Sequence, residues 1–187
     1  MRKKGIFLIA IATVLLAATI AGCASAPAVK KGDNVTIDYI INSTDGKVYQ
    51  TSYAQLAKDL GIYDASTKYV PYSFVVGSGT AIVGIDEAVV GMKVDETRTV
   101  VVPPEKSYGL YNQSLVTAFN LSDVMAGNPT LKVNDTVGVS TGQNGISVAR
   151  NARVASIDAA NNTVYLDFNR AHAGETLVIQ VTVRKIQ

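Results

Sequence analysis

Residues 72–96, YSFVVGSGTAIVGIDEAVVGMKVDE, decide the fold that we predict for this chain. A β-branched and aromatic run ends at Gly77, the start of a Gly-Ser-Gly stretch that tolerates the positive φ of a tight turn. The next apolar residues recur at the spacing of one helix face, at Ile85, Ala88 and Val89. Because a helix of about two turns is marginal alone, we expect this face to lie against a sheet.

Strands are predicted on both sides of this unit, because β-branched and apolar residues there are bounded by turn residues. The predicted strands cover residues 34–41, 47–51, 97–102 and 177–184. The last of these alternates cleanly, which indicates one buried and one solvated face. Residues 53–70 open with a helical run that ends at Gly61, and they form either a lid over a site or a surface decoration.

Residues 113–168 are too many for a loop. Three further strands, at 137–141, 146–157 and 163–168, predict a small antiparallel domain of its own. Its ends leave the main chain after Asn112 and return at Asn169, so both lie near Tyr108.

Four blocks of this sequence resemble FKBP-type peptidyl-prolyl isomerases. They are the strand, turn and helix of 76–94, the loop PPEKSYG at 103–109, Asp38-Tyr39, and DGKVY at 45–49. The resemblance covers residues 30–187 and is closest to the long archaeal, SlyD-like branch. It implies an α+β fold in which a twisted antiparallel sheet wraps a short central helix, with a small mainly β insert domain in the flap.

The family resemblance also implies an activity, which is isomerisation of the bond before proline. That bond rotates over a barrier of about 18–20 kcal/mol without nucleophile or proton relay, so a dry pocket with well-placed donors suffices. The hydroxyl of Tyr108 and the backbone N–H of Ile82 would be the donors. The implied pocket residues are Tyr39, Tyr49, Gln50, Tyr72, Ala81, Ile82, Ile85, Tyr108 and Ile179.

Four positions depart from the family pattern: Gln50 replaces the usual Asp, Ile85 the Trp of short eukaryotic members, Arg170 the usual His and His172 the usual Leu. The resemblance implies an isomerase and folding helper acting on proline-containing, unfolded or partly folded polypeptides, with chaperone activity from the insert. Gln50 and His172 leave open an alternative, a binding module or holdase of the same fold with little isomerase activity.

The N-terminus has the layout of a secretory signal. Basic residues 2–4 precede an uncharged apolar run, 6–21, that ends in small residues just before the only cysteine, Cys23. This arrangement resembles a lipobox, so we expect the Cys23 thiol to carry a lipid and the protein to be anchored at the cell membrane, facing outside the cytoplasm. An uncleaved membrane anchor is the alternative, although a span needs about 20 apolar residues.

Composition limits the partners and cofactors. Without the signal, the chain has 14 basic and 15 acidic residues, so we expect no nucleic-acid partner. The lone histidine has no companion ligand, and we expect no metal and no other cofactor. We expect a monomer with four parts: a signal peptide with lipobox (1–22), a flexible tether (23–32), an isomerase domain (33–112 with 169–187) and an insert domain (113–168).

Overall fold

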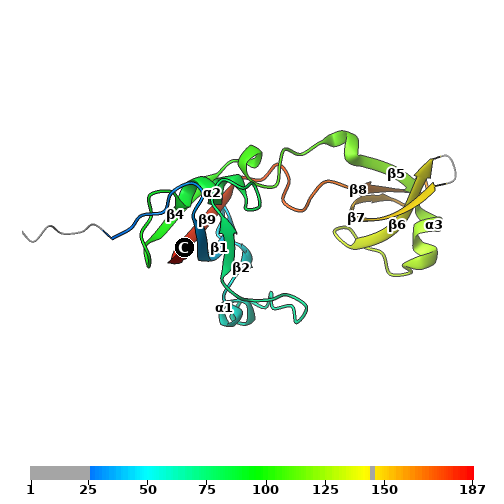
Figure 1. The fold of residues 1–187 in the computed structure, drawn as a ribbon. Helices are drawn as coiled ribbons and strands as arrows, with labels where there is room; N and C mark the ends of the chain where they lie inside the picture. Colours follow the sequence, from blue (N-terminus) through cyan, green and yellow to red (C-terminus); the bar gives the residue numbers. More distant parts are fainter. Residues whose placement is uncertain (1–25, 144–145) are drawn as a thin grey trace, which may run out of the picture.

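The structure, a computed structural model, describes residues 26–143 and 146–187. These residues form two antiparallel sheets with few helices, which lie apart from each other in Figure 1. This agrees with the mainly antiparallel sheet structure expected from the sequence. The first sheet has the order β2-β1-β9-β4, with β3 also paired to β1. Its strands are β1 (Asn34–Ser43), β2 (Val48–Thr51), β3 (Tyr72–Val75), β4 (Thr97–Val102) and β9 (Leu177–Ile186).

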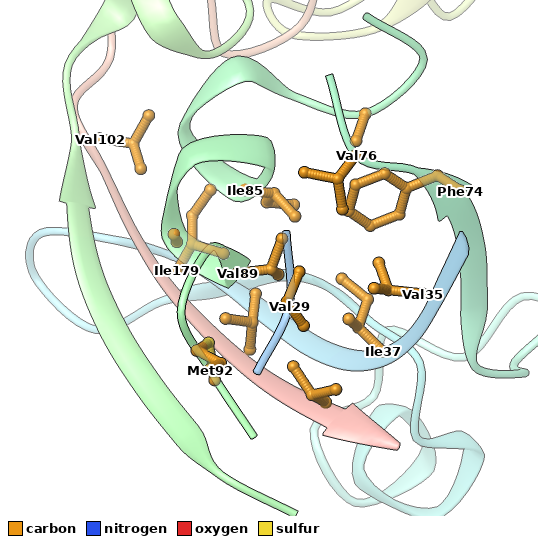
Figure 2. Packing of buried hydrophobic residues seen from close by; sticks show 14 of the residues in the cluster. Val29, Val35, Ile37, Phe74, Val76, Ile85, Val89, Met92, Val102 and Ile179 are labelled. Carbon is orange, nitrogen blue, oxygen red and sulfur yellow. The ribbon is translucent and has the colours of Figure 1, made fainter. Parts of the chain in front are cut away.

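Helix α2 (Val83–Val89) lies against this first sheet and buries the face that the residue spacing predicts, with Ile85, Ala88 and Val89 enclosed. Figure 2 shows Ile85 and Val89 packed near Ile179 of β9. The alternating residues of β9 from Leu177 to Val183 are fully buried on the same side. Burial of aliphatic side chains at about 25 cal/mol per Å² stabilises a helix that would be too short by itself.

The N-terminal predictions fall largely outside the described residues, because the signal (1–22) and Cys23 precede residue 26. The segment expected to remain a flexible tether up to residue 32 is fixed from Ala28 onward. Ala28 forms a β-bridge with Lys93, and Val29 is 1% exposed within the core, where Figure 2 labels it. Its N–H donates to Met92 O at 2.8 Å. Across residues 26–143 and 146–187, no helix has the length and apolar content to traverse a bilayer.

The second sheet has the order β5-β8-β7-β6 and a core of its own, centred on the fully buried Val154, Val164 and Leu166. Its strands are β5 (Val116–Asn120), β6 (Thr136–Gln143), β7 (Ile146–Asp158) and β8 (Thr163–Asp167). Strand β5 and helix α3 (Leu121–Gly127) were not predicted. The side chain of Asn120 caps α3 by accepting a hydrogen bond from the N–H of Asp123. Asparagine is a preferred N-cap residue, so the sequence did contain a signal for the start of this helix.

The two chain segments that join the sheets are held together at one point. The N–H of Asn112 donates to Asn169 Oδ1 at 2.9 Å, and Asn169 Nδ2 donates back to Asn112 O at 3.0 Å. The other elements lie outside the sheets and are α1 (Ala54–Asp59) and the short helices η1 (Pro104–Lys106) and η2 (Gln113–Leu115). The chain therefore leaves the first sheet for the second, and returns from it, at adjacent points.

Candidate active site

An open pocket of about 470 Å³ lies at the edge of the first sheet. Three predicted site residues line it, namely Tyr49 and Gln50 on β2 and Tyr108 after η1. The remaining wall is residues 170–172. We call residues 169–175, which lead from the second sheet back to β9, the return segment. The turn carrying Tyr108 is fixed by the N–H of Gly109, which donates to Pro104 O, while Gly109 O accepts from the N–H of Gly174 in the return segment.

Several tyrosine hydroxyls gather around the half-buried Tyr39 of β1. Burial raises the pKa of Tyr39, and the nearby hydroxyls of Tyr108, Tyr72 and Tyr69 raise it further. Burial also raises the pKa of Tyr108. Because a free tyrosine already titrates near pH 10, both hydroxyls stay protonated and able to donate at neutral pH. The Tyr108 hydroxyl lies 3.5 Å from Gln50 Oε1, the outer limit of a hydrogen bond, so a substrate carbonyl can replace this weak contact.

The entrance to α2 contains the second predicted donor, the backbone N–H of Ile82. The hydroxyl of Tyr72 donates to Thr80 O at 3.1 Å and so holds the turn before the helix. Ile82 is the residue before α2, and its carbonyl accepts from the N–H groups of Ile85 and Asp86. Within the described residues, the N–H of Ile82 donates to no protein group, as expected for an orphan donor at a helix start.

The remaining six predicted site residues do not line this pocket. Ala81 and Ile85 are buried where α2 begins, and Ile179 is 0% exposed in the middle of β9. Tyr39, Tyr72 and Ile82 form an intermediate, half-buried layer packed against this core. The predicted residues thus divide into three that line the pocket and six that belong to the core of the first sheet or pack against it.

Sequence reasoning missed a polar cluster at the rim. The Tyr49 hydroxyl donates to Glu175 Oε2 at 2.7 Å, which raises the pKa of Tyr49, and His172 Nδ1 lies 3.4 Å from Glu175 Oε1. The His172 ring also stacks on the Tyr49 ring, with centroids 3.7 Å apart, and meets Tyr108 at 6.0 Å. The contacts of Tyr49 with His172 and Glu175 join residues more than 120 positions apart, so no local sequence pattern predicts them. Of these residues, only His172 stands out in the sequence beyond the family pattern, as a departure from it.

The stretch predicted to be a lid or a decoration comes near Tyr39 through Tyr69. Tyr69 stacks on Tyr63, with ring centroids 5.1 Å apart, and its hydroxyl accepts from the N–H of Asp64. That loop brings Tyr69 close enough to Tyr39 to raise the pKa of Tyr39. Among residues 26–143 and 146–187, no three His, Cys, Asp or Glu side chains lie close enough together to hold a metal ion.

Residues 26–120 match the family described as FKBP-type peptidyl-prolyl cis-trans isomerase. The short-type peptidyl-prolyl cis-trans isomerase of Methanocaldococcus jannaschii is 36% identical over 159 residues, which cover 85% of this chain and 94% of that protein. FK506-binding protein 1A of Neurospora crassa is 36% identical over 80 residues, 43% of this chain and only 56% of that protein. The crystal structure of FkpA from Escherichia coli aligns with a TM-score of 0.42 and 20% identity, covering 87% of this chain and 43% of that chain.

Proposed function

The chain belongs to the FKBP-type peptidyl-prolyl cis-trans isomerase family, and from that premise we propose that its two sheets divide the work of a SlyD-like folding helper. The first sheet, with α2, rotates the bond before proline in unfolded or partly folded polypeptides. The second sheet is an insert in the flap that holds the rest of the polypeptide. The observation that carries the proposal is the open pocket lined by Tyr49, Gln50 and Tyr108, with the half-buried Tyr39 near Tyr108.

The chemistry asks the pocket to favour a twisted amide over a planar one. Rotation weakens the C–N partial double bond and changes the charge on the carbonyl oxygen, so binding that improves in the twisted state lowers the barrier. The neutral hydroxyl of Tyr108 and the N–H of Ile82 are the donors for substrate carbonyls. The half-buried rings of Tyr39 and Tyr72 keep water from the proline ring. Each well-placed neutral donor contributes roughly 0.5–1.5 kcal/mol.

Two observations support the separate holding role of the second sheet. It has its own hydrophobic core, and its two connections meet at the Asn112 and Asn169 hydrogen bonds. A client held there stays near the pocket, because linking two weak sites raises the effective concentration at the second one.

The alternative, a binding module with little isomerase activity, is favoured by the rim. The His172 ring covers one face of Tyr49, and Gln50 offers the pocket an amide instead of a carboxylate. The stacked His172 ring reduces the apolar wall that a proline and its neighbour would contact, and Gln50 can form hydrogen bonds but lacks the negative charge of the usual Asp.

The proposed location is the outer face of the cytoplasmic membrane, with a lipid on Cys23. Support comes from the basic residues 2–4, the apolar run 6–21 and the small residues before Cys23.

The test uses the soluble chain starting at Ala24, with and without its second sheet. Replacing residues 113–168 by a short Gly-containing loop joins Asn112 to Asn169, whose hydrogen bonds already bring these ends together. We expect the shortened protein to keep kcat/KM on a prolyl tetrapeptide within about tenfold, or about 1.4 kcal/mol. It should lose most of its ability to speed proline-limited refolding or prevent aggregation.

Equal loss on peptide and protein, in a shortened variant shown by circular dichroism to be folded, would contradict the division of labour. Absence of peptide turnover in the longer chain, with aggregation still prevented, would select the binding module instead.

A further inference from the structure

A second and larger cavity, of about 700 Å³, adjoins the pocket. Its walls come from both sheets, with Tyr49 of β2 on one side and Asn151 and Arg153 of β7 on the other. Tyr49 and the return-segment residues 170–172 line both this cavity and the pocket. We call the larger cavity the inter-sheet cleft. A bound client polypeptide with its proline in the pocket can therefore extend into the inter-sheet cleft without crossing the protein core.

The carboxylates of the cleft are already occupied by protein partners. Asp167 accepts from Arg153 Nη2 at 2.7 Å and from Asn169 Nδ2 at 2.8 Å. Glu175 accepts from the Tyr49 hydroxyl at 2.7 Å and faces His172. Carboxylates with these partners offer few further acceptor sites to a ligand.

Two cations of the cleft are in the opposite situation. Lys47 and Arg170 line the cleft, both are exposed, and within the described residues neither side chain forms an ion pair. The ammonium of Lys47 lies 5.8 Å from the Tyr49 ring centroid. The largest cause of the lowered pKa of Asp45 is the hydrogen bond that the hydroxyl of Ser43 donates to this carboxylate, and the nearby charge of Lys47 helps to lower it. In the described part of the chain, however, Asp45 and Lys47 form no ion pair. The cleft therefore presents uncommitted positive charge beside the pocket.

We infer that the inter-sheet cleft recognises an acidic side chain of the client polypeptide, within a few residues of the proline that is isomerised. Arg170 is the principal contact, because it lines both cavities and its guanidinium fits a carboxylate with two parallel hydrogen bonds. Lys47 adds a second, more flexible charge. This inference rests on the proposed function, because it takes the client to be a polypeptide bound in the pocket.

The length of chain involved follows from backbone geometry. An extended residue spans about 3.3–3.6 Å, so an acid two to four residues from the proline can reach the cleft while the proline stays in the pocket. The amide side chains of Asn134 and Asn151 also line the cleft and can bond the backbone of such a segment. The positive charges of the cleft thus select clients with an acidic residue, whereas the amides bond the backbone of any extended segment.

The test is a set of prolyl peptides in which Glu, Gln or Lys stands two to four positions before or after the proline. For the soluble chain at low ionic strength, we expect Glu peptides to exceed matched Gln peptides in kcat/KM by about threefold to tenfold, as for one or two solvated ion pairs. The ratio should fall toward one in Arg170→Gln and in Lys47→Gln/Arg170→Gln. It should also fall in about 1 M salt, where the Debye length is about 3 Å.

Lys185→Gln is the matched control, because Lys185 is an exposed cation of β9 that does not line the cleft. Its Glu-to-Gln ratio should equal that of the parent. A ratio near one in the parent, or a ratio that persists in the double variant, would overturn the inference. If no peptide is turned over, the proposed function fails and fluorescence anisotropy of labelled Glu and Gln peptides decides the inference on the same ratio.

Discussion

The ring of His172 stacks on the ring of Tyr49, with centroids 3.7 Å apart and planes inclined by 22°. His172 holds this position from a left-handed backbone conformation, with φ of 63°. Such a conformation is uncommon for a residue other than glycine and costs of order 1 kcal/mol. The cost is offset by the stack and by the contact with Glu175. The apolar face of Tyr49 that the pocket would offer to a substrate is thereby partly replaced by a polar ring.

Changing His172 should therefore alter the preference for the residue before proline. In His172→Leu, the rim becomes apolar, and kcat/KM for a Leu-Pro peptide should rise about threefold to tenfold relative to an Ala-Pro peptide, since a buried CH₂ is worth about 0.8 kcal/mol. The matched control is His172→Asn, which tolerates the left-handed backbone but stays polar. A rise in both variants would attribute the effect to loss of the stack alone.

The hydroxyl of Tyr108 and the ring of Tyr72 should differ in importance. Tyr108→Phe removes one donor that contacts Gln50 only weakly in the free protein, so kcat/KM should fall modestly, by about threefold to tenfold. Tyr72→Ala should reduce it more, because it exposes the pocket to water and frees the turn at Thr80. Tyr165→Phe, on the exposed face of β8, is the control and should change nothing. Parent rates in both folded site variants would place the site elsewhere.

Gly84 should be required for α2 to pack on β4. An added Cβ would collide with both methyl groups of Val102. Gly84→Ala should therefore lower the free energy of unfolding of the first sheet and α2 by about 1–3 kcal/mol, despite the better helix propensity of alanine. Urea unfolding measures the change. Gly127→Ala in α3 is the matched control, because its Cβ meets open space, and it should be neutral or slightly stabilising. Adding Val102→Ala to Gly84→Ala should recover part of the loss.

Acid should weaken the second sheet through Asp167, which is 3% exposed. Burial alone would raise the pKa of Asp167, but hydrogen bonds from Asn169 and Arg153 outweigh it, and the pKa is lowered. The ionised carboxylate therefore contributes stability above the unfolded pKa, near 3.9, and this contribution is lost as pH falls through the lower folded value.

Asp167→Asn should thus be less stable than the parent in thermal unfolding at pH 7, and the gap should narrow below about pH 4. Asp123→Asn makes the same charge change on the exposed surface of α3 and serves as the control. A gap that is constant with pH would mean that packing, rather than charge, explains the loss.

The proposed anchor depends on a single thiol. Cys23→Ser removes the group that would carry the lipid, so the protein should move from the detergent-extracted fraction to the soluble one or remain as an unprocessed precursor. Fractionation with mass spectrometry of the N-terminus measures both. Unchanged membrane association together with a cleaved N-terminus would exclude the lipid.

The periodic segments of the first sheet were predictable because burial of one face imposes a local pattern. The spacing of Ile85, Ala88 and Val89 predicts the buried face of α2, and the alternation from Leu177 to Val183 predicts that of β9. Helix α3 and strand β5 were not predicted, because they have only seven and five residues, too few for a clear periodic pattern. The role of β5 is evident only from its pairing with β8. The predicted roles of the pocket residues remain predictions.

The sequence by itself determined which stretches alternate, where glycine turns the chain and which residues carry the family resemblance, because these depend on neighbours along the chain. Only the tertiary structure decided that Glu175 accepts a hydrogen bond from Tyr49, that Asn169 closes on Asn112, and that Val29 belongs to the core. These pairs are separated by up to 126 residues. These contacts follow from how the chain folds over long distances in the sequence, and no local spacing encodes them.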